Sequence, residues 1–450
     1  MASLTDQSAL VDLAQQLVET ARRAGADAAD AVAVRSASLS VEVRDGAVEE
    51  SERSEADDLG LRVLVDRRQA VVSTNDLSQT SIAALVERGL AMARAAPQDP
   101  FAGLADRERI ANSFPDLDLV DPELPDVERL EGLALETESA AKSVRGVTKS
   151  AGASAGAGIA GMVLATSEGF CGAYLGSHHS LAMTAIAGEG TAMERDYDFS
   201  SALHAADLDD PSTIGRNAGE RAVKRVNPRK VPSGRVPVVF DPRVSGSLVS
   251  HLGSAVNGAA IARRTSFLQD KLGDVLFRSE IRILDDPLRR RGLRSRPFDA
   301  EGVAGRAIAL VENGVLKSWL LDCATARELG QVTTGHAQRG GSSAPSPGPS
   351  NLYLEPGKRK PQALIGEIRQ GFYVTDLIGM GVNYVTGDYS RGAAGFWIEN
   401  GELTYPVSEV TIAGNLIEMF GALEPADDLV FRYGTNAPTL RVEGLTVAGH

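Results

Sequence analysis

The sequence predicts an α+β protein in which N-terminal helix and antiparallel-sheet units precede a C-terminal, mixed, hairpin-rich β domain with a few helices. Apolar residues at helical spacing over 10–21 give way to strand-like alternation over 31–65. A second round of helix, β region and helix occupies 127–226. From Arg235 onward, Asn-Gly pairs separate strand-like runs, which is the strongest local signal of a β-hairpin.

The first segment, 1–120, is expected to be an N-terminal α+β domain. Its first helix should end at Gly25, and a second helix over about 78–96 should stop before Pro97, because proline cannot continue a helix. The strands expected between these helices are 31–36, 39–43 and 61–65, with turns at Asp45-Gly46 and at 66–68. This order predicts an α-β-β-β-α unit with an antiparallel sheet.

The central segment, 121–234, is expected to repeat that order as a second α+β domain. It begins with a helix over 127–144, continues with a Gly/Ala/Ser-rich β region over 149–194, and ends with a helix over 211–226. The order of elements repeats while the residues do not, which makes an internal duplication a hypothesis only.

The last segment, 235–450, is expected to form the β-rich domain. A strand at 236–240 leads into Asp241-Pro242, a favourable N-cap and first-turn pair for a helix reaching about Ala262. Hairpins are predicted at 312–315 and 399–402, and a short helix should start at Asp322.

Composition excludes several classes of function. The 450 residues carry a net charge of −14, which makes nucleic acid a poor partner, and no uncharged apolar run reaches membrane-spanning length. Cys171 and Cys323 match no zinc or redox spacing and are expected to be free thiols in a reducing compartment. A protein of the cytoplasm, without a membrane contact, is expected.

The most informative stretch is the polar, Gly/Ser/Pro-rich run 333–357, because loops this long inside a domain are usually functional or disordered. It resembles the corresponding region of the TldD/PmbA family, a two-subunit type of metallopeptidase. We expect this loop to line a peptide site. The candidates for peptide contact are His336, Gln338, Arg339, Ser342 and Ser343.

In the catalytic TldD-type subunit the resemblance implies a helix with His-Glu-x-x-x-His and a Cys from a distant strand as the zinc site. The matching positions in this sequence are Val249, Ser250, Ser254 and Gly392. Moving the register so that His251 is the first ligand leaves Leu252 and Ala255 at the other two helix positions. Neither register offers a zinc site. The chain therefore resembles the PmbA (TldE)-type subunit, which lacks the zinc-binding motif.

The resemblance implies a non-catalytic, metal-free subunit that helps enclose and cleave unfolded or leader peptides. On that basis we expect no cofactor and no catalytic residue in this chain, which alone should be inactive. Zinc is expected only in a TldD-type partner. The isolated chain is a candidate homodimer, and the family also has a historical link to modulation of DNA gyrase.

Two alternatives come from other classes of protein. The first is a stand-alone peptide-binding protein without hydrolytic activity. The second is independent hydrolysis through Ser154, which lies in a Gly-x-Ser-x-Gly pattern, or through His336. His178-His179 does not suggest metal, because neighbours on a strand face opposite sides. The basic run 288–296 is interpreted as a solvated loop, or as a contact to an acidic partner or substrate terminus.

Overall fold

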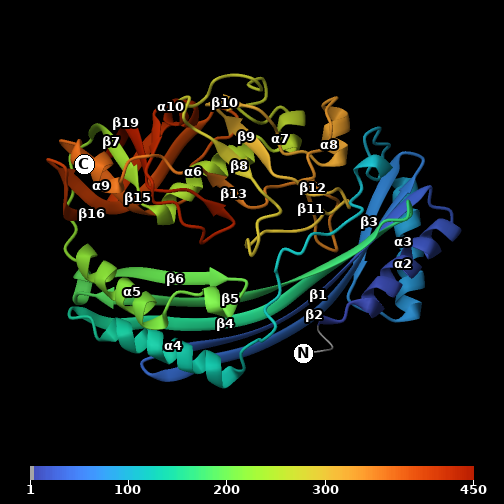
Figure 1. Cartoon of the computed structure of the whole chain (residues 1–450), viewed down its shortest axis with the longest axis horizontal. Helices are drawn as coiled ribbons and strands as arrows, with labels where there is room; N and C mark the ends of the chain where they lie inside the picture. Colours follow the sequence, from blue (N-terminus) through green and yellow to red (C-terminus); the bar gives the residue numbers. More distant parts are fainter. Residues whose placement is uncertain (1–4, 450) are drawn as a thin grey trace.

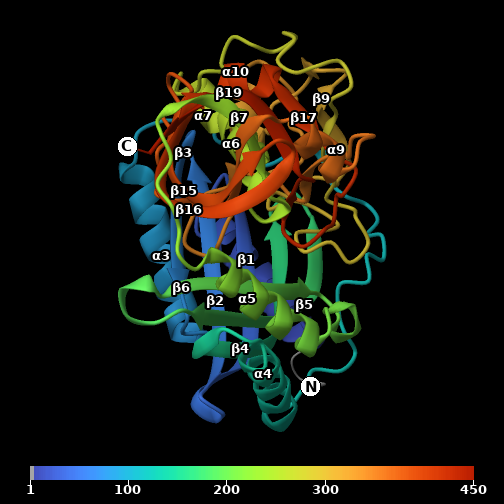
Figure 2. The same ribbon diagram turned by 90° about the vertical axis from the view of Figure 1, so that its left-hand side faces the viewer.

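The computed structural model describes residues 5–449 and shows two stacked layers (Figure 1). The lower layer is a long curved sheet with helices on its outer side, and it ends at α5. Residues from 234 onward form the upper layer. Figure 2 shows the same stacking from the side, with β6 and α5 beneath the C-terminal strands.

The lower layer matches the predicted order of elements. Its helices are α2 (Ser8–Arg23), α3 (Gln79–Ala95), α4 (Val127–Lys142) and α5 (Pro211–Arg225). Its strands are β1 (Ala28–Arg44), β2 (Ala47–Val65), β3 (Arg68–Thr74), β4 (Val147–Thr166), β5 (Cys171–Ala187) and β6 (Glu194–Ala202). All four predicted helices are confirmed to within a few residues at each end.

The six strands of the lower layer form one antiparallel sheet among the described residues, in the order β3-β2-β1-β4-β5-β6. β1 pairs with β4 from Asp30 opposite Thr166 to Val43 opposite Ala153. The first two segments of the chain therefore share a continuous sheet. Each contributes a helix, three strands and a helix, on either side of the β1–β4 pair.

Two strand predictions in this layer were wrong in their bounds. The expected strands 31–36 and 39–43 are one strand, β1, the first half of β2 (residues 47–58) was missed, and β3 was not predicted. That half is rich in charged residues and largely exposed, so its side chains show no alternation. Its pairing with β1 supplies the backbone hydrogen bonds that make it a strand.

Helices cover the outer face of the sheet in two pairs. Leu17 of α2 and Leu85 of α3 pack into one apolar cluster with β1, β2 and β3. Leu130 of α4 and Ile214 of α5 pack into a second cluster with β4 and β5. The inner face of the sheet is left for the upper layer.

The upper layer contains short helices and many strands. Its helices are α6 (Pro242–Ala255), α7 (Gly258–Ala262), α8 (Cys323–Glu328), α9 (Pro361–Gly366) and α10 (Leu416–Gly421). Its strands are β7 (Gly234–Phe240), β8 (Ile283–Asp285), β9 (Ile308–Glu312), β10 (Val315–Leu316), β11 (Ala337–Gln338), β12 (Ser346–Pro347), β13 (Leu352–Leu354), β14 (Gln370–Ile378), β15 (Asp388–Glu399), β16 (Glu402–Asn415), β17 (Leu423–Pro425), β18 (Thr435–Asn436) and β19 (Leu440–Ala448).

The main sheet of this layer runs β16-β15-β14-β7-β19-β17, and an additional pairing of β16 with β19 closes part of it into a barrel. β14 and β7 are parallel, while the other neighbours are antiparallel. The predicted mixed, hairpin-rich α+β architecture is confirmed.

The Asn-Gly hairpins are present as predicted. Asn313 and Gly314 have φ of 51° and 76°, and Asn400 and Gly401 have φ of 50° and 84°, as a type I′ turn requires. The helix expected to reach Ala262 ends earlier, because the Asn257 side chain caps a separate helix, α7, by accepting from the Ala259 N–H.

The basic run 288–296 fastens the upper layer to the lower one. Arg291 Nε lies 2.6 Å from the Asp118 carboxylate, and Arg291 Nη1 lies 2.9 Å from that of Asp207. Arg290 Nη2 also reaches Asp118, at 2.8 Å. The run is therefore solvated at the exposed Arg290 and Arg294, while Arg291 pairs with two carboxylates of the same chain.

No helix within residues 5–449 combines the length and the apolar character that a membrane crossing requires.

Candidate functional site

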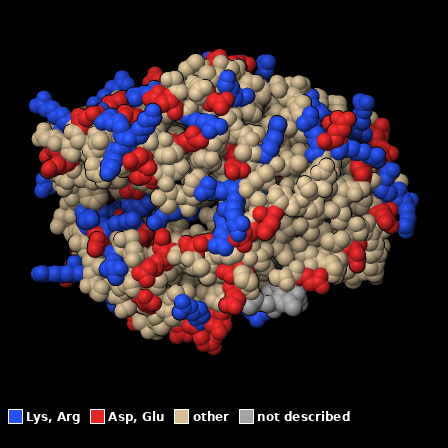
Figure 3. Space-filling model, in the orientation of Figure 1, with Lys and Arg blue, Asp and Glu red and all other residues tan. Residues whose placement is uncertain are grey.

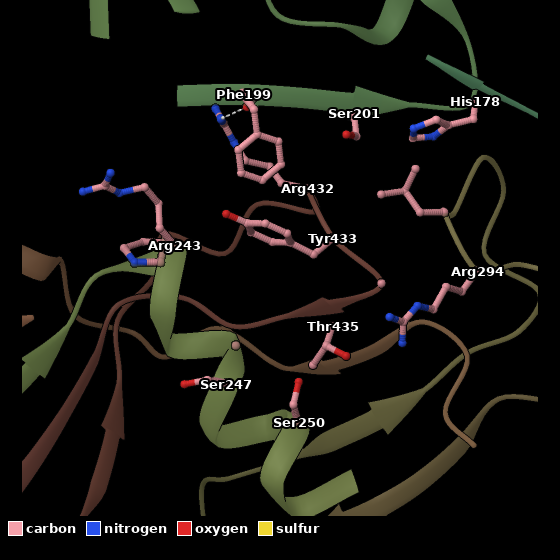
Figure 4. Close-up of a pocket in the computed structure, with 14 residues that line it drawn as sticks. His178, Phe199, Ser201, Arg243, Ser247, Ser250, Arg294, Arg432, Tyr433 and Thr435 are labelled. Carbon is pink, nitrogen blue, oxygen red and sulfur yellow. Dashed lines mark hydrogen bonds between the residues drawn. The ribbon is translucent and has the colours of Figure 1, made fainter. Parts of the chain in front are cut away.

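A cleft of about 490 Å³ lies between the two layers. Its lower wall is formed by His178 of β5 and by Phe199 and Ser201 of β6. Its upper wall is formed by the first turns of α6 and by the segment 432–435. Figure 3 shows a hollow between the layers with Lys and Arg side chains around it, and Figure 4 shows the lining side chains facing each other.

Two arginines of the cleft are held in place by carboxylates. Arg243 Nη1 lies 2.7 Å from Asp196 Oδ1, and its Nε lies 3.2 Å from Asp241 Oδ1. Although burial opposes the shift, these two carboxylates raise the pKa of Arg243 above its usual range. Arg432 Nη2 lies 3.1 Å from Asp209 Oδ2. Both cations are thereby largely neutralised by their neighbours.

Arg294 is the exception among the cleft arginines. Its side chain has no carboxylate and no hydrogen-bond acceptor within the described residues, and the residue is exposed. Its backbone N–H is fixed by Asn351 Oδ1 at 2.9 Å. The guanidinium lies against the backbone of Gly434, where a Cβ would come within 2.0 Å of Arg294 Nε. The cleft therefore holds one uncompensated positive charge.

Apart from the His178 imidazole, whose pKa burial lowers, the remaining polar side chains of the cleft carry hydroxyls. Ser247 Oγ donates to the Val244 carbonyl at 2.6 Å, while Ser201, Ser250 and Thr435 also line the space. Burial raises the pKa of Tyr433 to about 12, so its phenol is protonated at neutral pH and can donate a hydrogen bond.

The apolar pattern of α6 decides which of its side chains reach the cleft. Asp241 caps the helix by accepting from the Arg243 N–H at 2.9 Å. The apolar face enters the core of the upper layer through Val244, Leu248, Val249 and Leu252. Ser250, one turn on from Ser247 along the helix, is exposed and lines the cleft with it.

His251, the other candidate on α6, is half-buried in a cluster of tyrosines. Its Nδ1 lies 2.8 Å from the Tyr384 hydroxyl, and its ring lies edge-on to Tyr389 with centroids 5.9 Å apart. Burial, together with the nearby Arg391 guanidinium, lowers the pKa of His251 to about 4. The imidazole is therefore neutral at physiological pH. Gly392 follows Arg391 on β15.

Family models of the PmbA/TldA metallopeptidases match nearly the whole chain. Domain 1 matches residues 29–93, the central domain matches 120–226, and the C-terminal domain matches 233–449. The chain belongs to this PmbA/TldD metallopeptidase family. A relative from Haemophilus influenzae, named metalloprotease PmbA homolog, is 36% identical over 96% of this chain and 94% of its own length.

Solved structures of the family agree with that assignment. A putative modulator of DNA gyrase from Bacteroides thetaiotaomicron superposes with a TM-score of 0.91 and 30% identity, over 99% of this chain and all of that one. TldE from Thermococcus kodakarensis shares the fold, with a TM-score of 0.87 and 22% identity, over 97% of this chain and 100% of that one. The expected PmbA-type family assignment is confirmed by the family models and by the PmbA homolog at 36% identity.

The PmbA/TldD family name implies a metal, and the positions that the resemblance assigns to the TldD-type zinc ligands do not fit one. Val249 is 2% exposed and lies in the apolar core. Ser250 and Ser254 offer only hydroxyls, and Gly392 has no side chain. In the part of the chain that the structure describes, no three His, Cys, Asp or Glu side chains are grouped to hold a metal ion.

The loop 333–357 lies differently from what we expected. His336 is fully buried, and its Nε2 lies 3.0 Å from Asp285 Oδ1. Arg339 Nη1 pairs with Asp30 of β1 at 2.6 Å, and both side chains are at most 3% exposed. An exposed Arg339 in contact with peptide is therefore a wrong expectation for this structure, because Asp30 on the interior strand β1 pairs with its charge.

The other loop candidates are more accessible. Gln338 is partly buried, and its Nε2 donates to the Pro349 carbonyl at 2.6 Å. Ser342 and Ser343 are exposed. None of the five loop candidates lines the cleft. Contact of Ser342 and Ser343 with a peptide stays a prediction.

The serine hydrolase pattern has no catalytic context. Ser154 lies inside β4, which runs without a break from Val147 to Thr166, whereas a nucleophile elbow needs a turn into a helix. The two adjacent histidines separate as expected, since His179 is buried 3.2 Å from Asp121 and His178 faces the cleft.

Sequence reasoning missed most of the cleft. Arg243, Arg432 and Tyr433 form no local pattern, because they come from segments almost 190 residues apart. Arg294 lay in the basic run 288–296, and His178 and Ser250 were named for other reasons, but none of the three was predicted to line this cleft.

Proposed function

We propose that this PmbA-type chain is the metal-free subunit of a TldD/TldE-type peptidase that helps enclose unfolded or leader peptides. A zinc-bearing TldD-type partner would cut the peptide. The observation that carries the proposal is the composition of the four matching positions, Val249, Ser250, Ser254 and Gly392, in a member of a metallopeptidase family. The free thiols Cys171 and Cys323 fit a cytoplasmic location.

The cleft between the layers supplies a place for such a peptide. Extended peptides often bind as an added strand on a sheet edge, and β6 is the outer strand of the lower sheet. However, the carbonyl of Phe199 already accepts from Arg432 Nη1 at 3.5 Å, and that of Tyr197 accepts from Arg221 Nη1 at 3.1 Å. The peptide would therefore be held through side-chain hydroxyls of the cleft and through Arg294.

Reconstitution tests the proposal. The chain and a TldD-type subunit from the same cell are purified separately, and cleavage of an unstructured peptide is measured with each alone and with both. We expect cleavage with the pair, loss of cleavage with a chelator, and none with this chain alone. Chelator-resistant cleavage by this chain alone would overturn the assignment.

A stand-alone peptide-binding protein is the second candidate, because it would use the same cleft to hold a peptide. Affinity purification from the native cell separates the two. Recovery of a partner containing His-Glu-x-x-x-His supports the subunit, while peptide binding with no such partner supports the stand-alone protein.

A further inference from the structure

The cleft differs from the rest of the molecule in its charge. The chain carries a net charge of −14, yet three arginines and no carboxylate line this space. Arg243 and Arg432 are paired with Asp196 and Asp209 behind the cleft wall. Only Arg294 remains available to a ligand.

The surroundings of Arg294 suit a small anionic group. In Figure 4, Arg294 lies at the same end of the cleft as Thr435 and His178, away from Arg243. Hydroxyl groups of Ser250 and Thr435 line the same space and can donate hydrogen bonds. A single guanidinium with neighbouring hydroxyls matches one carboxylate, whereas a polyanion would meet the overall negative charge of the protein.

We propose that the cleft is a carboxylate-recognition site in which Arg294 pairs with a carboxylate of the bound peptide and so fixes its position. This inference rests on the proposed function, because it names the part of the peptide that this chain would hold. A guanidinium and a carboxylate form two parallel hydrogen bonds, which select for orientation as well as charge.

The backbone around Arg294 is built to keep the guanidinium in place. Asn351 Oδ1 accepts from the backbone N–H of Arg294, and the absence of a side chain at Gly434 lets the guanidinium lie directly on the backbone. Asn351 is itself buried, and its Nδ2 donates to the Asp286 carbonyl at 2.7 Å. A pre-positioned cation loses less freedom on binding than a flexible one.

Two sources of carboxylate are distinguished by experiment. Binding of the full-length chain to a fluorescent unstructured peptide is measured in three forms: a free C-terminus without acidic side chains, the same peptide amidated, and an amidated peptide with one internal Glu. We expect the preferred carboxylate form to bind about tenfold more tightly than the amidated, non-acidic form. Tighter binding of the peptide with the free C-terminus identifies the terminal carboxylate, and tighter binding of the Glu peptide identifies a side-chain carboxylate.

Variants tie the preference to one residue. Arg294→Gln is expected to bind all three peptides equally and weakly, while Arg294→Lys keeps part of the preference because it keeps the charge. Arg369→Gln is the matched control, since Arg369 is exposed, lies between α9 and β14, and does not line the cleft. Melting temperatures verify that each variant is folded.

The outcomes separate this inference from the proposed function. Binding of all three peptides without a carboxylate preference, or a preference that survives Arg294→Gln, overturns the inference and leaves the peptide-holding role standing. Absence of binding for every peptide overturns both.

Discussion

Arg339 illustrates how little a single residue's role can be deduced from its neighbours in sequence. Its polar, glycine-rich surroundings predicted an exposed ligand contact, yet it meets Asp30, which lies 309 positions away along the chain. Arg62 Nε shares that carboxylate at 2.9 Å, and Glu301 lies 4.0 Å from Arg62 Nη2. The group forms a buried ionic network between the layers, and nothing in the local sequence indicates it.

Replacing Arg339 with Ala should therefore destabilise the protein. Removing one partner of a buried ion pair costs about 3–5 kcal/mol, and because Arg62 still pairs with Asp30 we expect about 2 kcal/mol. Chemical denaturation measures the change, with Arg369→Ala as the exposed control. Unchanged stability together with weaker peptide binding would restore Arg339 as a peptide contact.

Glu301 gives the same network a dependence on pH. Burial, followed by the charge of Asp299, raises the pKa of Glu301 from its ordinary 4.5 to about 7. The folded state then binds the proton more tightly than the unfolded state, so stability falls as pH rises from about 4.5 to 7. Below this window both states are protonated and the effect is constant.

Glu301→Gln should flatten this dependence. The amide oxygen can still accept from the Cys323 N–H, which lies 2.8 Å from the carboxylate, but it cannot ionise. We expect the melting temperature of the variant to rise relative to wild type as pH increases from 5 to 7.5. Parallel profiles for the two proteins would show that Glu301 does not titrate in this range.

Among the elements, those with local signals were predicted and those made by pairing were not. The N-caps of helices α3, α4 and α5 are Ser78, Asp126 and Asp210. Their side chains accept hydrogen bonds from first-turn N–H groups. The two Asn-Gly pairs likewise predicted two hairpins that the structure contains. The charged half of β2 and the closure of the barrel by β16 and β19 depend on long-range pairing, which has no local signature.

The same division explains the candidate site. The four positions on α6 and β15 come from comparing a motif of fixed spacing with the sequence, and their match to zinc ligands stays a prediction. The cleft itself could not be predicted from the sequence, because its lower wall, with His178 and Ser201, meets Arg432 of the upper wall only when the two layers stack. The orientation of α6 is set by its core face, as Val249 shows.

The contact of the loop 333–357 with β2 gives a prediction for elements. A Cβ at Gly60 would lie 1.9 Å from the Gly341 carbonyl oxygen, so Gly60→Ala must displace the loop. We expect a loss of about 1–3 kcal/mol in the free energy of unfolding. Gly340→Ala is the control in the same loop, since a Cβ there meets no atom within 4 Å. Equal stability of both variants would show that the loop is not fastened to the sheet.

At the scale of the whole molecule, the junction between the two layers differs from the interior of each layer. The lower sheet and the barrel each have their own apolar core, and ionic and aromatic contacts join them. Phe298 of the upper layer, for example, packs with its centroid 5.1 Å from that of Phe170 in the lower one. A cleft at such a junction can hold a ligand without disturbing either core.

The absence of zinc ligands at the matching positions leads to a prediction for the full chain. Zinc sites in proteins need imidazole, thiolate or carboxylate groups, and Val249, Ser250, Ser254 and Gly392 supply none of them. His251 is a neutral imidazole but points to Tyr384, and a single imidazole does not hold zinc tightly. After dialysis against a weak chelator, elemental analysis should therefore find well under one zinc per chain, and added zinc should not raise the melting temperature. A TldD-type subunit treated in the same way is the positive control.

About one tightly held zinc per chain, with a rise in melting temperature when zinc is added back, would contradict the prediction. The metal site would then lie elsewhere in the fold, and this chain would not be the metal-free subunit.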